Sequence, residues 1–172
     1  MQIHKTPFDP HFHVVLHEPE IPQNTGNIGR TCLAMGACLH LIEPLGFDLD
    51  EKALRRAGLD YWPRLSPRIY PNWGAYIEAH PDARRWYFTA RKGRAYFEVA
   101  FSSGDHLVFG KETAGLPRSL LEGHEDAWLS IPMRRGERSL NLSTVVCAAL
   151  CEGVRQGIDA GWVGLGDGAY LL

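Results

Sequence analysis

Three short segments rich in glycine, proline and polar side chains could together bind a ligand. They are residues 109–117 (FGKETAGLP), 131–133 (IPM) and 139–143 (SLNLS). The first follows the apolar run Leu107–Phe109, and the second ends the run Trp128–Ile131. Because ligands of parallel sheets bind outside the carboxyl ends of the strands, we expect these segments to meet at one edge. Glycine there lets the backbone approach a ligand closely.

Glu112, Ser139 and Asn141 are polar residues of these segments and candidates for the site. Each also has a structural interpretation. A carboxylate such as Glu112 often stabilises the positive N-terminus of a helix, and Ser139 or Asn141 could cap the helix that follows. Both roles can coexist, because a capped helix start is a good place to fix a ligand-binding loop.

The cysteines and histidines show no spacing typical of a metal site. The cysteines form no CxxC pair, and the histidines form no HExxH motif. His11, His13 and His17 crowd the first predicted strand, where hydrogen-bonded or solvated histidines are more common than metal ligands. We therefore expect no metal.

Length and composition are those of one globular domain. A chain of 172 residues can bury a sizeable core, and no apolar run approaches the ~20 residues of a membrane span. The first residues form no apolar signal segment, so we expect a cytoplasmic protein without a membrane partner. The net charge of −2 argues against a basic coat for nucleic acid. Basic clusters at 55–56, 91–94 and 134–138 could still contact phosphates.

Strands and helices alternate along the chain, which predicts an α/β fold with a mostly parallel sheet flanked by helices. Asn24 or Thr25 is expected to cap the first helix, and Gly36 to end it. Asn72 is expected to cap a later helix. The predicted strands span residues 12–17, 37–43, 85–90, 106–109 and 128–131. The predicted helices span residues 24–35, 50–56, 72–80, 118–121 and 140–156.

The chain divides into an N-terminal extension (1–11), one domain (12–157) and a glycine-rich tail (158–172). The tail contains the segment GLGDG at 164–168. That segment follows a helix and opens no βαβ unit, so it is not expected to bind a dinucleotide.

Three motifs in this order resemble the SPOUT, or knotted, RNA methyltransferases. Residues 18–30 (EPEIPQNTGNIGR) look like the first motif, 110–117 like the second and 131–143 like the third. Residues 42–47 (IEPLGF) and 54–61 (LRRAGLDY) resemble one branch of that superfamily. The branch is the small, single-domain tRNA wobble-nucleoside ribose 2′-O-methyltransferases, and the likeness covers residues 12–157.

The resemblance implies a C-terminal trefoil knot, a homodimer, and S-adenosylmethionine held mainly by backbone among the knot loops, with S-adenosylhomocysteine as product. The implied substrate is the 2′-hydroxyl of the wobble nucleotide, cytidine or modified uridine, in the tRNA anticodon stem-loop. The implied catalytic residues are Arg30, Glu112 and Asn141, with Asn24 supporting the first-motif loop. The implied cofactor contacts are Thr89, Gly110, Ile131, Ser139 and Leu140.

Arg30 is the residue expected to matter most for the chemistry, and two roles are open for it. The family is often described with this arginine as the base. Neutralising a guanidinium of pKa near 13.8 at pH 7 costs about 9 kcal/mol, which makes that role demanding. Holding a phosphate or orienting the hydroxyl uses the five donors of the charged fork. The resemblance also implies that Arg30 serves the site that contains the partner subunit's cofactor.

Three other functions compete with wobble methylation. The same chemistry could act on another RNA such as rRNA, although relatives that do so often carry an extra RNA-binding domain. The fold could also serve as a non-catalytic RNA-binding module, which Arg30, Glu112, Ser139 and Asn141 argue against. A nucleotide-binding α/β protein would need a glycine-rich loop after the first strand. The loop after His17 instead contains two prolines and two glutamates.

Overall fold

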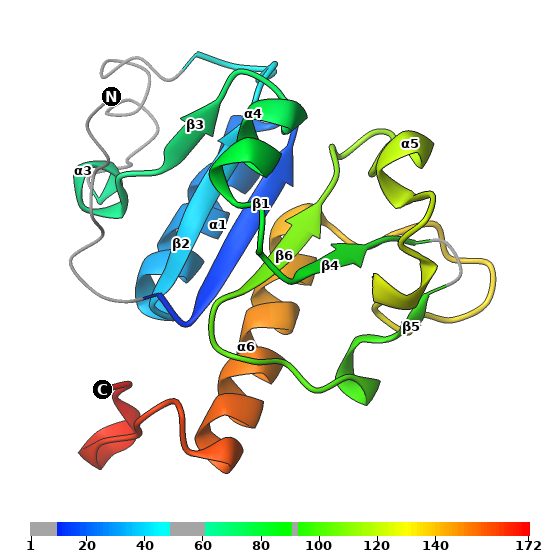
Figure 1. The fold of residues 1–172 in the computed structure, drawn as a ribbon. Coiled ribbons are helices and arrows are strands. Elements are labelled where there is room, and N and C mark those ends of the chain that lie inside the picture. Colours follow the sequence, from blue (N-terminus) through cyan, green and yellow to red (C-terminus); the bar gives the residue numbers. More distant parts are fainter. Residues whose placement is uncertain (1–9, 49–60, 91–92) are drawn as a thin grey trace.

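The computed structural model describes residues 10–48, 61–90 and 93–172, which form a parallel sheet with helices on both faces (Figure 1). All strand pairs in this part of the chain run parallel. The predicted α/β class is therefore confirmed. The strand order is β3-β2-β1-β6-β4-β7-β5. The strands are β1 (Phe12–His17), β2 (Ala37–Ile42), β3 (Arg68–Tyr70), β4 (Arg85–Phe88), β5 (Arg94–Ala95), β6 (Asp105–Phe109) and β7 (Trp128–Ser130).

The central strands β1, β2 and β6 are buried almost throughout because helices cover both faces. One face packs against α1 (Pro22–Ala34), α3 (Trp62–Leu65) and α6 (Leu142–Ala160), and includes Val14 and Leu16. The other packs against α4 (Trp73–Ala79) and α5 (Arg118–Leu121), and includes Val15. The described residues also contain three 3₁₀ turns: η1 (Tyr96–Glu98) after β5, η2 (Glu125–Ala127) before β7 and η3 (Asp167–Ala169) after α6.

The start of α1 differs from the prediction. The helix begins at Pro22, with Ile21 at the N-cap and no side-chain cap. Asn24 and Thr25 are buried inside it, so the expectation that either of them caps the helix was wrong. Proline explains the earlier start, because its fixed φ suits the first turn and its missing N–H needs no partner there.

Two other helix ends follow the expected cap chemistry. Gly36 takes φ +64° just after α1, and the Asn72 side chain accepts a hydrogen bond from Ala75 N at 2.9 Å at the start of α4. The prediction was wrong about the end of α6, which continues to Ala160 and stops at the left-handed Gly161. Gly157 lies inside the helix, and the close packing explains why this position is a glycine, since a Cβ there would lie 2.5 Å from a methyl group of Val163.

Short elements account for the remaining differences. The strands β3 and β5 and the helix α3 were not predicted, since runs of two to four residues carry no measurable periodicity. The helix predicted at 50–56 lies outside the described residues, as does most of the 1–11 extension. The trefoil knot and the boundaries of the domain and tail stay predictions.

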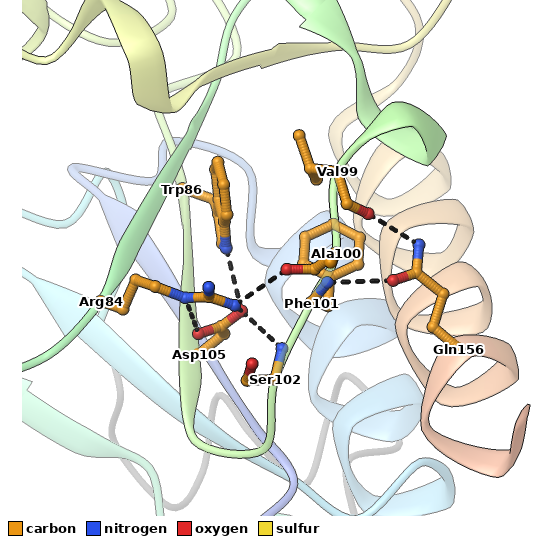
Figure 2. A network of polar contacts seen from close by, with 8 residues as sticks. All are labelled: Arg84, Trp86, Val99, Ala100, Phe101, Ser102, Asp105 and Gln156. Atoms are coloured by element: carbon orange, nitrogen blue, oxygen red, sulfur yellow. Dashed lines mark hydrogen bonds and ion pairs between the residues drawn. The ribbon is translucent and has the colours of Figure 1, made fainter. Parts of the chain in front are cut away.

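A buried carboxylate fixes the end of the sheet opposite the ligand-binding segments. Asp105 is 2% exposed and accepts hydrogen bonds from Arg84, from Trp86 Nε1 at 2.9 Å and from Ser102 N at 2.9 Å (Figure 2). Gln156 of α6 binds the same loop, accepting from Phe101 N at 2.9 Å and donating to Val99 O at 3.0 Å. This network ties the loop before β6 to the long helix.

Replacing Asp105 with alanine should lower the free energy of unfolding by about 2–4 kcal/mol, because Trp86 and Ser102 lose their buried acceptor. The Arg84 side chain is half exposed, so water can replace its lost partner. The loss of this ion pair therefore adds less to the cost. Urea unfolding measures the change. The matched control Asp159→Ala removes an exposed ion pair with Arg155 and should cost less than about 0.5 kcal/mol. Equal costs for the two variants would contradict the account.

A histidine cluster fills the sheet face beneath α4. The His13 and His40 rings share a 2.8 Å hydrogen bond, and Tyr76 Oη lies 2.6 Å from His106 Nδ1. Burial is the main cause that lowers the pKa of His13 to about 4 and that of His106 to about 2. The cluster consists of His13, His40, His80, His106, Tyr70, Tyr76, Arg68 and Arg85.

The geometry of this cluster favours packing over metal binding. Ring nitrogens of His13, His40 and His106 lie within 4.8 Å of one another. The His13 and His106 rings are stacked, with centroids 4.1 Å apart and planes 7° from parallel. An imidazole lone pair lies in its ring plane, so two stacked rings cannot direct theirs at one ion. The nearby cations of the cluster oppose another positive charge.

The histidine cluster predicts acid sensitivity. The folded imidazoles stay neutral, whereas those of the unfolded chain gain protons below their ordinary pKa of 6.5. The free energy of unfolding should therefore be intact above pH 6.5 and fall as pH is lowered toward 5, by up to about 1.4 kcal/mol per pH unit for each histidine. Urea unfolding across this window measures the slope, and His106→Gln should flatten it. An unchanged slope in that variant would refute this origin.

Candidate active site

The three segments singled out in the sequence meet at one cavity of about 480 Å³, a size typical of small-molecule sites. It lies at the carboxyl ends of β4 and β6, as expected for a parallel sheet. Apolar side chains form part of its lining, among them Phe88 and Phe109, whose rings stack with centroids 4.6 Å apart. The start of α6 contributes Leu142 and Val145.

The segment after β6 folds back on itself at Gly110. A Cβ at this position would lie 2.0 Å from the backbone carbon of Gly115, so no other residue fits. Gly115 takes φ +69°, and its N–H donates to Lys111 O at 2.8 Å. The close approach expected at Gly110 is therefore to the loop's own backbone, which holds the loop at the edge of the cavity.

Glu112 joins this loop to the N-terminus of α1. Its carboxylate accepts hydrogen bonds from Glu20 N at 2.8 Å, Ile21 N at 3.3 Å and Asn24 Nδ2 at 3.0 Å. The negative charge lies against N–H groups at the start of a helix, where it is favourable. Glu112 therefore does both things considered from the sequence: it stabilises the N-terminus of a helix, and it lies in the candidate site.

Asn24 and Asn141 continue the chain of hydrogen bonds to the third segment. Asn141 Nδ2 donates to Asn24 Oδ1 at 3.0 Å, and Asn141 Oδ1 caps α6 by accepting from Ser143 N at 2.9 Å. Because an ionised carboxylate only accepts, Glu112 fixes which end of each amide donates. Of the two predicted caps, Asn141 is the one that acts. The relay from Glu112 through Asn24 to Asn141 connects segments far apart in the sequence.

Two further contacts between these loops were not found from the sequence. The Glu20 carboxylate accepts from Thr113 N and Thr113 Oγ1, each at 3.0 Å. Lys111 Nζ lies 2.9 Å from Glu18 Oε2, and this contact raises the pKa of the lysine. Both glutamates lie in the proline-rich loop after β1. The presence of two glutamates there was the only signal in the sequence, because contacts between loops follow no periodicity.

The residues expected to contact the cofactor all line the cavity: Thr89, Gly110, Ile131, Ser139 and Leu140. Asn24, Glu112 and Asn141 line it as well. The backbone of Thr89 joins two strand ends, since its N–H donates to Leu129 O at 2.9 Å and its carbonyl accepts from Ser130 Oγ at 2.7 Å. Arg138, from the basic cluster, also lines the cavity.

Arg30 is not among the residues that line this cavity. It lies on the exposed side of α1, with its guanidinium carbon 5.2 Å from the centroid of the Tyr61 ring. The expected catalytic residues are thus brought together in one chain with the exception of Arg30.

Comparisons with known proteins agree with this geometry. The model of the SpoU rRNA Methylase family matches residues 11–151. A tRNA (cytidine(34)-2′-O)-methyltransferase of Saccharophagus degradans is 49% identical over 146 residues, which are 84% of this chain and 95% of that protein.

Two solved structures share the fold. One, described as giving structural insights into the 2-OH methylation of C/U34 on tRNA, has a TM-score of 0.79 and 46% identity, and the match covers 86% of this chain and 97% of the other. The SpoU methyltransferase AviRb of Streptomyces viridochromogenes, in complex with the cofactor AdoMet, has a TM-score of 0.77 and 26% identity over 92% of this chain and 65% of that one.

The protein belongs to the SpoU methylase family, and its resemblance to the knotted RNA methyltransferases is confirmed at the level of family and fold. No helix among the described residues is long and apolar enough to cross a membrane.

Replacing Glu112 with alanine should lower the free energy of unfolding by about 2–3 kcal/mol, since two backbone N–H groups and one amide lose a charged acceptor. S-adenosylhomocysteine should also bind at least about tenfold more weakly, because the loops lose their common anchor. Urea unfolding and calorimetry measure the two effects.

The control is Glu122→Ala, which removes an exposed ion pair with Arg118 and should change neither quantity. Wild-type ligand affinity in the Glu112 variant would show that the relay does not shape the cavity.

Proposed function

We propose that this protein transfers the methyl group of S-adenosylmethionine to the ribose 2′-hydroxyl of the wobble nucleotide, cytidine or modified uridine, in the tRNA anticodon loop. The observation that carries the proposal is the cavity lined by the hydrogen-bonded relay of Glu112, Asn24 and Asn141. The relative from Saccharophagus degradans supports the substrate, because its name specifies this position and nearly its whole length matches.

The cavity residues fit such a cofactor. The volume suits a ligand of this size, and the folded-back loop from Gly110 to Leu116 lines the cavity. The backbone of Gly110, Ile131 and Leu140, with Ser139 and Thr89, would hold the adenosine part. The cofactor supplies an electrophilic methyl group on a sulfonium, and the chemistry needs no metal. The complex of AviRb with AdoMet supports this assignment.

The protein's own residues act mainly by positioning. Bringing two reactants into attack geometry can lower the activation free energy by about 7–11 kcal/mol. Glu112, Asn24 and Asn141 keep the loops in one arrangement, and Arg30 holds the RNA at a phosphate or at the reacting hydroxyl. The charged fork is the better assignment for Arg30, since acting as a base costs about 9 kcal/mol in deprotonation at pH 7.

The proposed assembly is a homodimer in which each Arg30 serves the cavity of the partner. Support comes from the position of Arg30, which is exposed on α1 and is not among the residues that line the cavity of its own chain. A two-fold axis would place both copies of the arginine equivalently. Each site would then draw on both subunits.

The anticodon stem-loop would lie across the rim of the cavity. Arg138 is exposed and lines the cavity, and the exposed Arg134 and Arg135 precede it in the same loop, so all three can neutralise phosphates. Arg91 and Lys92, from a second basic cluster, lie outside the described residues. The proposed location is the cytoplasm, where tRNA is modified. Ribosomal RNA is the alternative substrate, favoured by the description of the matched family as rRNA methylases.

The test of substrate is transfer of labelled methyl from S-adenosylmethionine to a synthetic anticodon stem-loop, followed by mass spectrometry of the nucleosides. The expected product is one methyl on the wobble ribose, and a 2′-deoxy nucleotide at that position should abolish it. Transfer to rRNA fragments but not to the stem-loop would favour the alternative. No transfer to either RNA, with S-adenosylhomocysteine still bound, would favour the non-catalytic module.

Arg30→Ala should lower single-turnover methyl transfer by at least about a hundredfold. Affinity for S-adenosylhomocysteine should stay within about threefold, because the proposed role of Arg30 is to hold the RNA and not the cofactor. Arg30→Lys should also fail if the planar fork is what matters. The control is Arg118→Ala, which removes another exposed arginine and should change neither the rate of methyl transfer nor the affinity for S-adenosylhomocysteine. Near-wild-type transfer by Arg30→Ala would remove this residue from the mechanism.

A further inference from the structure

Tyr61 packs on α1 through two contacts, one with the side chain of Arg30 and one with the backbone of Gly26. Its ring, 5% exposed, lies under the guanidinium, with 5.2 Å between the guanidinium carbon and the ring centroid. Its hydroxyl donates a hydrogen bond to Gly26 O, inside α1. In an α-helix the carbonyl of Gly26 is the acceptor for the N–H of Arg30, four residues later. One side chain therefore touches both the head group of Arg30 and the carbonyl that fixes its backbone.

The packing around this contact leaves little freedom. Gly29, next to Arg30, faces α3 so closely that a Cβ there would lie 2.6 Å from Leu65 Cδ2 and 3.5 Å from the Tyr61 ring. Trp62 and Leu65 are buried against the same helix. The segment from Tyr61 to Leu65 is thus seated directly on α1 beside the arginine.

An exposed arginine without such a contact samples many rotamers, and each must be lost when it grips RNA. A face of aromatic carbon favours a guanidinium stacked on it. The ring therefore reduces the number of conformations that Arg30 must give up, and the hydroxyl bond to Gly26 O holds the ring on α1.

We propose that Tyr61 is a positioning residue for Arg30, which presents the guanidinium from the outer side of α1 in the orientation that methyl transfer requires. The proposal rests on the role assigned to Arg30 above. It makes the ring of Tyr61, and not only its packing on α1, necessary for a fast reaction.

The test compares Tyr61→Leu, which removes the aromatic face, with Tyr61→Phe and Tyr61→Trp, which keep it. Single-turnover methyl transfer to the anticodon stem-loop should slow at least about tenfold in Tyr61→Leu and stay within about threefold in the two aromatic variants. Affinity for S-adenosylhomocysteine should be unchanged in all three.

Leu65→Ala is the matched control, because it loosens the same helix contact without touching Arg30. It should lower the melting temperature yet keep the rate. Equal slowing by Leu65→Ala and Tyr61→Leu, or by Tyr61→Phe and Tyr61→Leu, would overturn the proposal in favour of packing or of the hydroxyl.

A second measurement does not need activity. The side-chain NMR signals of Arg30 should show the ring-current shift of a stacked aromatic in the wild type and in Tyr61→Phe, and lose it in Tyr61→Leu. The same shift in all three proteins would overturn the contact itself. Arg30→Ala in the same kinetic assay separates the two claims: wild-type transfer by that variant refutes the role of Arg30, whatever the spectra show.

Discussion

The negative charge of Glu112 at the N-terminus of α1 is the interaction on which the candidate site depends. No strand pairing connects the loop after β6 with the loop after β1. The carboxylate of Glu112, in the first of these loops, joins them by accepting from two backbone N–H groups and one side-chain amide at the start of α1. The strands bring the loops to one edge of the sheet, but they do not set the spacing between them. That spacing follows from Glu112, from the glycine that folds its loop back, and from the contacts of Glu20 with Thr113 and of Glu18 with Lys111.

The direction of the hydrogen bonds gives the site a single arrangement. An amide side chain can usually be turned either way, yet Asn24 must donate to Glu112, and its oxygen is then left for Asn141. Asn141 in turn caps the long helix α6. The position of that helix is also fixed at its other end, where Gln156 binds the loop held by Asp105 (Figure 2). Both ends of α6 are thus tied to loops of the sheet.

Features that follow from hydrophobic periodicity or from a sequence motif could be predicted from the sequence. The buried strands β1, β2 and β6 lie close to their expected bounds, and the three ligand-binding segments meet as expected. Local rules were less informative where tertiary contacts compete. Asn24 has the side chain of a cap, but it is used in the relay, and Pro22 starts the helix. The pairing of Glu20 with Thr113 joins residues far apart in the sequence, and no spacing rule predicts it.

Arg30 does not line the cavity of its own chain, so the proposed mechanism needs a second subunit, and mixed dimers test this proposal most directly. One subunit carries Arg30→Ala, and the other carries Leu140→Glu, which puts a charge at an exposed position of the cavity lining and should block the cofactor. If Arg30 acts on the partner, the intact cavity of the first subunit meets the intact arginine of the second. Methyl transfer should then reappear on mixing two inactive homodimers. The contrary result is that the two inactive homodimers exchange subunits but the mixed dimers show no methyl transfer. Arg30 would then act within its own chain, and the proposed role of the partner would be wrong.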